Sequence, residues 1–320
     1  MFDLARSADE ARRAHKLESL YHRGQDLAWD GRAVLRELID KHGGIRVPEE
    51  KRAALGQIFA VIMWGELAAW KVSAQLADAI VELEPKMAAT SQAHDEARHF
   101  YVMHDYLEAL GQVPRTLDFA SRAVLEMVLE TDSLLKKLLG MQLMVESLAL
   151  TIFQLVRETR VEPVLTDLLR YYEKDEARHV GLGVQLLPRM MRELSRWQTA
   201  DLIWFQLRIL GWTLAGLKHL EWAWRALGVD PRRIVSLGRA KQALAFQELG
   251  KQLGIERVPR WRLDIIRGVK GVAGALFAAE GESRAGAFAR EWRAPLEDGL
   301  VATSLHPDEA PVMPRVPKPT

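Results

Sequence analysis

The chain has 320 residues, of which 48% are hydrophobic and 27% are charged, the mixture of a soluble globular protein with a sizeable core. Its 44 basic and 43 acidic residues leave a net charge of +1, so no overall field favours nucleic acid or an acidic membrane. Because the chain has 0 Cys, disulfides, thiolate zinc sites, iron–sulfur clusters and rubredoxin-type iron centres are excluded.

Helix-forming residues dominate the whole chain, and no segment shows the alternation that predicts a strand. Pro85 and Pro163 stand where a helix should begin, which is the position that tolerates proline. Gly111 and Gly228 follow apolar-periodic runs, as glycine does after a helix. In chain order the expected helices are 8–22, 27–42, 48–82, 86–110, 119–159, 163–194, 196–227, 231–253 and 260–279.

The N-terminal residues are charged and contain no apolar core of signal-peptide length. No stretch reaches the roughly 18 uncharged apolar residues of a membrane span. We therefore expect a cytoplasmic protein without a transmembrane segment. The proline-rich residues 306–320 are expected to form an extended tail.

The chain contains an internal repeat. The motif DEARH occurs at 95–99 and again at 175–179, and a glutamate stands 30 residues before the glutamate of each motif, at Glu66 and Glu146. Segments 48–110 and 119–194 therefore read as two copies of one helical hairpin. The expected organisation is N-terminal helices over 1–47, a bundle over 48–194, a C-terminal helical extension over 195–305 packed on the bundle, and the tail over 306–320.

Each hairpin brings a glutamate level with a Glu-x-x-His pair, because its two limbs are of similar length and each residue rises about 1.5 Å. Residues at i and i+3 share one helix face. Packing the two hairpins together gathers four carboxylates and two imidazoles, the inventory of di-iron and di-manganese carboxylate sites in helical bundles. The predicted metal ligands are Glu66, Glu96, His99, Glu146, Glu176 and His179.

The charges fit this interpretation, since four carboxylates offset two divalent cations and imidazole suits iron or manganese. Buried glutamates would be costly unless paired with metal. A single Glu-x-x-His is more often an ordinary surface pair. The identical recurrence of five residues, with a matched glutamate in apolar surroundings before each, favours the metal site.

The residues beside the predicted ligands suggest a supporting layer. Asp95 and Asp175 precede the ligand glutamates and could accept the second N–H of a ligating histidine, which would orient its ring. Arg98 and Arg178 could pair with these aspartates. Together they form the expected second layer of the site.

Three further polar residues lie one helical turn before a predicted ligand. Gln142 is expected in the supporting layer, and Gln92 is expected either there or at the surface. Tyr172 is our candidate catalytic residue, because it shares the metal-facing side and could hydrogen-bond a ligand or a bound oxygen species. The equal alternative is a core tyrosine bonded to a backbone carbonyl.

The two DEARH segments, together with Glu66 and Glu146 before them, resemble the ferritin-like di-iron carboxylate superfamily. Within it they are similar to bacterial multicomponent monooxygenases, soluble acyl-carrier-protein desaturases and oxidases related to the ribonucleotide reductase small subunit. The resemblance covers about 48–194 and implies an all-α, ferritin-like four-helix bundle with additional helices at both ends.

The chain departs from each branch of that superfamily. The position of the radical tyrosine of the reductase subunit is Met103. The valine and tyrosine that cross-link in the related ligand-binding oxidases correspond to Ala68 and Met141, so that cross-link cannot form. The threonine of the monooxygenases corresponds to Leu150. The resemblance therefore predicts the metal site and leaves the substrate open.

The resemblance implies an oxidoreductase that activates O2 at two iron ions to hydroxylate, desaturate or N-oxygenate an organic substrate. Fe/Fe is expected and Mn/Fe is the alternative. The expected partners are a small organic or acyl substrate, O2 and a separate electron donor, since no flavin, NAD or iron–sulfur motif occurs; a homodimer is compatible with these features. The rival functions are an iron-oxidising or storage protein and a non-catalytic metal-bound scaffold.

The residues after 194 favour substrate binding over storage, because storage bundles need little beyond four helices. We expect an apolar cleft between helices 48–82 and 119–159, near Ala69 and Ala149. Segments 202–217 and 261–277 are apolar with interspersed cations and are expected to cap the bundle or to dock a membrane or acidic carrier. In the docking hypothesis the basic rim is Arg257, Arg260, Arg262, Arg267 and Lys270.

Overall fold

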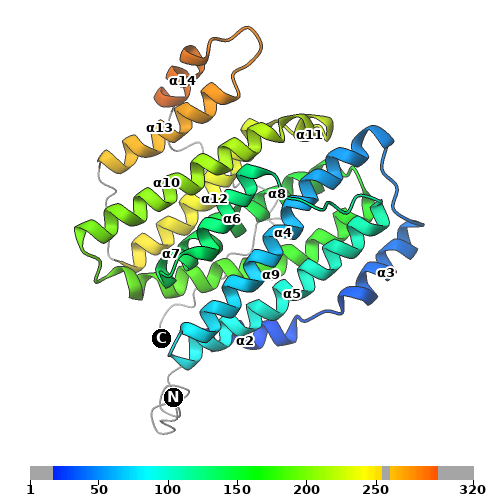
Figure 1. Ribbon diagram of the computed structural model, residues 1–320, viewed down its shortest axis with the longest axis horizontal. Helices are drawn as coiled ribbons and strands as arrows, with labels where there is room; N and C mark the ends of the chain where they lie inside the picture. The colour runs from blue at the N-terminus through cyan, green and yellow to red at the C-terminus, as the bar shows by residue number, and fades with distance from the viewer. Residues whose placement is uncertain (1–16, 254–259, 295–320) are drawn as a thin grey trace.

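The computed structural model describes residues 17–253 and 260–294, and within these ranges every regular element is a helix (Figure 1). This confirms the predicted all-α class. The helices are α2 (Leu17–Asp26), α3 (Gly31–His42), α4 (Glu49–Ala79), α5 (Leu83–Leu110), α6 (Phe119–Glu130), α7 (Leu134–Leu138), the π-helix η1 (Leu139–Val145), α8 (Glu146–Thr159), α9 (Pro163–Met191), α10 (Arg196–His219), α11 (Glu221–Ala226), α12 (Pro231–Gln252), α13 (Arg260–Leu276) and α14 (Arg284–Arg293).

The long helices α4, α5 and α9 and the composite helix η1–α8 form the four-helix bundle, and Figure 1 shows α4, α5 and α9 running side by side. The last helix of the first hairpin ends, and the last helix of the second hairpin begins, at a recognisable cap. Gly111 takes a positive φ of 75° after α5, and Glu162 accepts hydrogen bonds from the first amides of α9, which starts at Pro163. The ferritin-like bundle predicted from the repeat is therefore confirmed.

The prediction of one helix over 119–159 was wrong. The segment divides into α6, α7, η1 and α8, with a break at 131–133. Thr131 accepts a hydrogen bond from the amide of Ser133, and Ser133 caps α7 by accepting from the amide of Lys136. These cap-forming side chains compete with the helix for its own amides, which explains the break.

Two other elements differ from the prediction. The helix over 196–227 is interrupted at Leu220, which separates α10 from α11. Helix α14 was not predicted; it is short and begins at Ser283, which caps it by accepting from the amide of Gly286. The part of the predicted helix 8–22 that precedes Leu17 lies outside the described residues, as does the proline-rich tail.

Two apolar clusters fill the bundle, one on each side of its polar centre. Helix α4 contributes Phe59 and Met63 to the first cluster and Val72 and Leu76 to the second, with Glu66 between them. The polar side chains thus lie where the bundle is best shielded from water. Helices α4 and 134–159 would be long and apolar enough to cross a membrane, but 61% and 78% of their most apolar windows are buried within the protein.

The C-terminal helices cover one side of the bundle. Helices α10, α11 and α12 pack on α6, α4, α8 and α9, whereas α13 and α14 pair mainly with each other and form a projecting hairpin (Figure 1). Of the hypothesised basic rim, the structure describes the side chains of Arg267, which is partly buried, and Lys270. Lys270 is buried, with its Nζ 3.9 Å from Glu291, while Arg257 and the side chains of Arg260 and Arg262 lie outside the described residues.

Candidate metal centre

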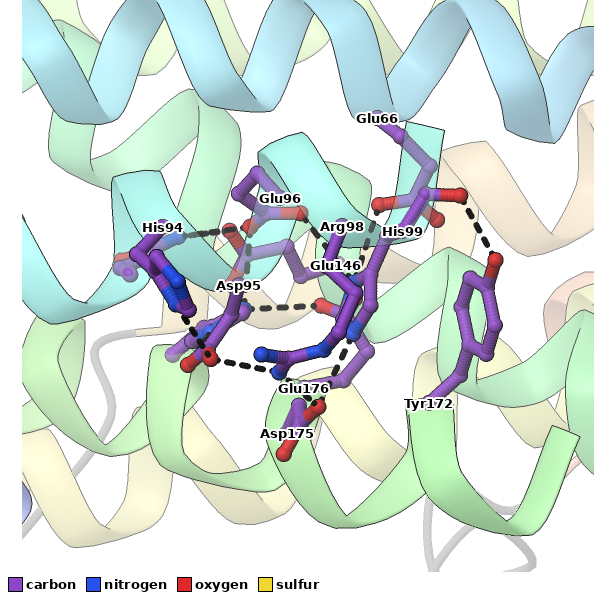
Figure 2. Close-up of polar contacts among 12 residues, drawn as sticks. Glu66, His94, Asp95, Glu96, Arg98, His99, Glu146, Tyr172, Asp175 and Glu176 are labelled. Carbon is purple, nitrogen blue, oxygen red and sulfur yellow. Dashed lines mark hydrogen bonds and ion pairs between the residues drawn. The ribbon is translucent and has the colours of Figure 1, made fainter. Parts of the chain in front are cut away.

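The structure brings the six predicted ligands together in the middle of the bundle (Figure 2). They come from four helices, α4, α5, α8 and α9, and each has a relative exposure of 5% or less. The i and i+3 spacing of the two DEARH motifs aims a carboxylate and an imidazole from the same helix face at the centre, as the repeat predicts.

The six side chains form two groups whose ligand atoms lie within 4.8 Å of one another. The first group is Glu66, Glu96, His99 and Glu176, and the second is Glu96, Glu146, Glu176 and His179. Two carboxylates, Glu96 and Glu176, belong to both groups. The arrangement can therefore hold two metal ions side by side, with the shared carboxylates spanning them.

The shared carboxylates divide their oxygens between the two groups. In the first group, His99 Nδ1 lies 3.4 Å from Glu96 Oε2 and 3.2 Å from Glu176 Oε1. In the second, His179 Nδ1 lies 3.0 Å from Glu96 Oε1 and 3.4 Å from Glu176 Oε2. Each histidine thus presents Nδ1 to the carboxylates, and each shared carboxylate offers one oxygen to each position.

The outer nitrogen of each histidine meets the aspartate of the opposite repeat. His99 Nε2 lies 3.0 Å from Asp175 Oδ2, and His179 Nε2 lies 3.4 Å from Asp95 Oδ2. Such a carboxylate fixes the ring and its tautomer, leaving Nδ1 free for a metal. Sequence reasoning identified the aspartates, but it did not predict that they exchange partners between the repeats.

Arg98 and Arg178 join Asp95 and Asp175 in a buried cluster of four charged side chains, here called the ion tetrad. Arg98 Nη2 donates to Asp95 Oδ1 (2.6 Å) and Asp175 Oδ2 (2.9 Å). Arg178 Nη2 donates to Asp95 Oδ2 (2.8 Å), and its Nη1 lies 2.7 Å from Asp175 Oδ1. The four side chains are at most 9% exposed, so two guanidinium groups balance two carboxylates in a low-dielectric layer.

Sequence reasoning missed Trp29, which lies between α2 and α3. Its indole Nε1 donates to Asp175 Oδ2 (2.8 Å), and the Arg98 guanidinium lies 4.8 Å from its ring centroid. The N-terminal helices therefore contribute directly to the supporting layer. No spacing or motif in the sequence connects this tryptophan with the repeat.

Gln92 and Gln142 form a second chain of contacts on the other side of the site. Gln92 Nε2 donates to Glu96 Oε1 (3.1 Å) and Glu146 Oε1 (2.6 Å), and Gln142 Nε2 donates to Gln92 Oε1 (3.4 Å). Both glutamines are buried, so of the two placements considered for Gln92 the structure shows the inner one.

Tyr172 is fully buried, and its hydroxyl donates to the backbone carbonyl of His99 (2.7 Å). Its ring stacks on the His99 imidazole with centroids 4.3 Å apart. Of the two interpretations that the sequence left open, these contacts support a core tyrosine bonded to a backbone carbonyl. They favour a positioning role for Tyr172 over a catalytic one. Met103 is likewise buried, whereas Tyr101 is 56% exposed.

Several buried atoms at the centre have no hydrogen-bond partner, namely Glu96 Oε2, His99 Nδ1, Glu146 Oε2 and Glu176 Oε1. All four belong to residues of the two candidate metal groups, and two of them, His99 Nδ1 and Glu176 Oε1, lie 3.2 Å apart. Unpaired polar atoms in a buried site are expensive unless something else satisfies them. The donor set therefore fits a pair of divalent ions better than a purely structural polar core.

The pKa values of the candidate ligands also favour a metal site. Burial, reinforced by neighbouring carboxylates such as Glu176, raises the pKa of Glu66 and Glu146 well above the usual glutamate value. Burial alone would lower the pKa of His99 and His179, but the surrounding carboxylates outweigh it and raise both well above the usual histidine value. These directions show that the carboxylates and imidazoles favour protonation when no cation is near, and metal binding to such ligands is expected to compete with protons.

A cavity of about 140 Å³ adjoins the carboxylates Glu66, Glu146 and Glu176. Its walls are largely apolar and come from α4, α6, η1, α8, α10, α11, α12 and α13. Ala69 and Ala149 line it, which confirms the cleft predicted beside these two small residues. The few polar lining residues away from the metal groups are Ser121, Thr213, Arg239 and Gln242.

Comparison with known proteins identifies the fold. No protein-family model and no curated protein matches the chain. Among solved structures, an R2-like ligand-binding oxidase with an aerobically reconstituted Mn/Fe cofactor matches with a TM-score of 0.55 and 18% identity over 75% of this chain and 93% of that chain. A variant with an Fe/Fe cofactor gives 0.55 and 17% over the same shares. These neighbours are ferritin-like di-metal carboxylate proteins, so the chain shares their bundle.

Proposed function

We propose that the protein is a di-metal carboxylate oxidase that uses O2 to oxidise an organic substrate. The observation that carries the proposal is the pair of overlapping carboxylate and histidine groups sharing Glu96 and Glu176, which open on an apolar cavity. An Fe/Fe pair is the proposed cofactor and Mn/Fe its alternative, in line with the cofactors of the structural neighbours.

In this proposal Glu66 and His99 complete one metal position, Glu146 and His179 complete the other, and the shared carboxylates join them. When bound, the metal pair supplies the electrons and the Lewis acidity for dioxygen reduction. Asp95 and Asp175 keep the imidazole protons on Nε2 and hold the rings in place.

The cavity supports an apolar substrate, such as a small organic molecule or an acyl chain. Its lining near Glu66 and Glu146 offers methyl, methylene and aromatic groups and excludes bulk water from the carboxylates. The C-terminal helices α10 and α12 supply much of that wall. A storage protein needs no such wall, and this favours oxidation of an organic molecule over iron storage.

We further propose that electrons come from a separate donor protein, because the sequence has no cysteine for an iron–sulfur centre. A soluble, cytoplasmic enzyme is in keeping with the ferritin-like neighbours and with the burial of the most apolar helices inside the bundle. A homodimer is compatible with this proposal.

Titration with Fe(II), first without and then with O2, tests the proposed function. We expect binding to saturate at about two iron atoms per chain, with oxidation on adding O2 and no growth in particle size. Iron analysis, absorbance and light scattering report these results. Uptake of many irons into large particles would instead establish storage, and an iron-loaded protein inert to O2 would establish a scaffold.

Filling the cavity is expected to separate substrate binding from metal binding. Ala149→Phe places a ring beside the site, so affinity for the apolar fluorescent probe anilinonaphthalene sulfonate should fall by roughly tenfold or more, while two metal ions still bind. Ala74→Phe, at an exposed position of α4 outside the cavity, is the matched control and should keep probe affinity. Equal losses in both variants would contradict this assignment of the cavity.

A further inference from the structure

The two metal positions are alike in their ligands but differ in what holds those ligands. Gln92 lies four residues before Glu96 in α5, and Tyr172 lies at the corresponding place before Glu176 in α9. The Gln92 carboxamide donates to two carboxylates, whereas the Tyr172 hydroxyl donates to a backbone carbonyl. The two copies of the repeat therefore differ in the residue that stands one helical turn before each shared carboxylate.

Both oxygens that Gln92 contacts belong to the same metal position. Glu96 Oε1, 3.1 Å from the Gln92 amide, is the oxygen on the His179 side, while Glu96 Oε2 faces His99. The other acceptor is Glu146 Oε1, whose partner atom Oε2 has no hydrogen bond. The amide thus occupies one oxygen of Glu146 and leaves the other for a metal.

The Gln92 side chain is itself held in place. Gln142 donates to Gln92 Oε1 (3.4 Å), so the carboxamide cannot turn its oxygen toward the carboxylates without losing this bond. Gln142 lies in the π-helix η1 and packs against Gly183 of α9, where an added methyl would come within 2.8 Å of Gln142 Cβ. The chain from α9 through Gln142 to Gln92 fixes the donor with buried groups alone.

The opposite position has no comparable donor. Glu66 has its Oε2 3.4 Å from His99 Nδ1, and no hydrogen bond from an amide side chain reaches it within the described residues. Both Glu66 and Glu146 border the apolar cavity, so the difference between them lies in the amide donor that reaches only Glu146. The two terminal carboxylates, Glu66 and Glu146, are therefore restrained to different degrees.

We propose that Gln92 is a positioning residue for the Glu146–His179 metal position alone, which makes the two positions unequal in metal affinity. The inference rests on the proposed function, because it presupposes that the two groups bind metals. Hydrogen bonds that orient metal ligands typically change metal affinity by about 10–100-fold. Gln92 gives such a bond to Glu146, which belongs to one position only, and to the oxygen of the shared Glu96 on that same side, so that position should bind metal more tightly for it.

The test isolates each position with one histidine variant. His99→Ala keeps the Glu146–His179 group, and His179→Ala keeps the Glu66–His99 group. Gln92→Met, which keeps the length of the side chain and removes its donor, is added to each. The dissociation constant of Mn(II) is measured from the electron paramagnetic resonance signal of free Mn(II), and circular dichroism of the metal-free variants checks that each one folds.

We expect Gln92→Met to weaken Mn(II) binding roughly tenfold in the His99→Ala background and less than about twofold in the His179→Ala background. Gln142→Leu, which frees the carboxamide, should weaken the same position to a smaller extent. Gln154→Met is the matched control and should leave Mn(II) binding unchanged in both backgrounds, because the Gln154 amide donates to Glu158 on the exposed side of α8, away from the ligands.

Equal losses in both backgrounds, or none in either, would overturn the inference while leaving the proposed function intact. If the unmodified protein and both histidine variants bind no Mn(II), the proposed function falls and the inference falls with it. A general effect on folding would weaken both positions together, so the comparison between backgrounds distinguishes positioning from stability.

Discussion

Replacing a shared carboxylate is expected to remove both metal ions, whereas replacing a terminal ligand should remove one. Glu96→Ala and Glu176→Ala each take a ligand from both groups, so metal content should fall from about two ions per chain to near zero. Glu66→Ala and His179→Ala each take a ligand from one group, so about one ion should remain. Metal analysis after gel filtration measures the content.

The contrast between shared and terminal ligands is the decisive part of this experiment. If all four variants retained the same fraction of metal, the two groups would not overlap at Glu96 and Glu176 as the geometry indicates. Full loading in every variant would show that the metals bind elsewhere.

Removing an arginine from the ion tetrad is expected to lower the free energy of unfolding more than any of the other substitutions. Arg178→Met leaves Asp95 and Asp175 buried with one cation between them, and removing one partner of a buried ion network costs about 3–5 kcal/mol. Urea unfolding of the metal-free protein, in the presence of a chelator, measures the free energy of unfolding. Metal binding should weaken as well, since both aspartates orient ligating histidines.

Arg122→Met is the matched control for this prediction. Arg122 pairs with Glu126 on the exposed face of α6, where water screens the interaction. The Arg122→Met variant should unfold at the same urea concentration as the unmodified protein. A similar shift in both variants would mean that the tetrad contributes no more than a surface ion pair.

The bundle and the meeting of the six candidate side chains at its centre were predictable because helical periodicity is local. Glu96 and His99 share a face by their spacing alone, and a doubled motif implies a second, similar face at Glu176 and His179. Apolar residues around Glu66 and Glu146 then place both faces inside. These inferences need no knowledge of how the hairpins pack.

The remaining features depend on contacts between segments far apart in the sequence. Periodicity does not fix the register between two hairpins, so it cannot show that His99 meets Asp175 and His179 meets Asp95. The residues of η1 have the composition of an ordinary α-helix, so their local pattern does not distinguish a π-helix. Trp29 lies beside α3 and acquires its role only when the N-terminal helices fold onto α9.

The contacts of the Trp29 indole also indicate which fragments of the chain would keep the site intact. A fragment starting at residue 48 would contain all six candidate ligands, yet it would lack the donor to Asp175 and the aromatic ring beside Arg98. A fragment ending at residue 194 would lose the helices that wall the cavity beside Glu66. The repeat marks where the candidate ligands lie, but we expect neither of its edges to bound a unit that keeps the site intact on its own.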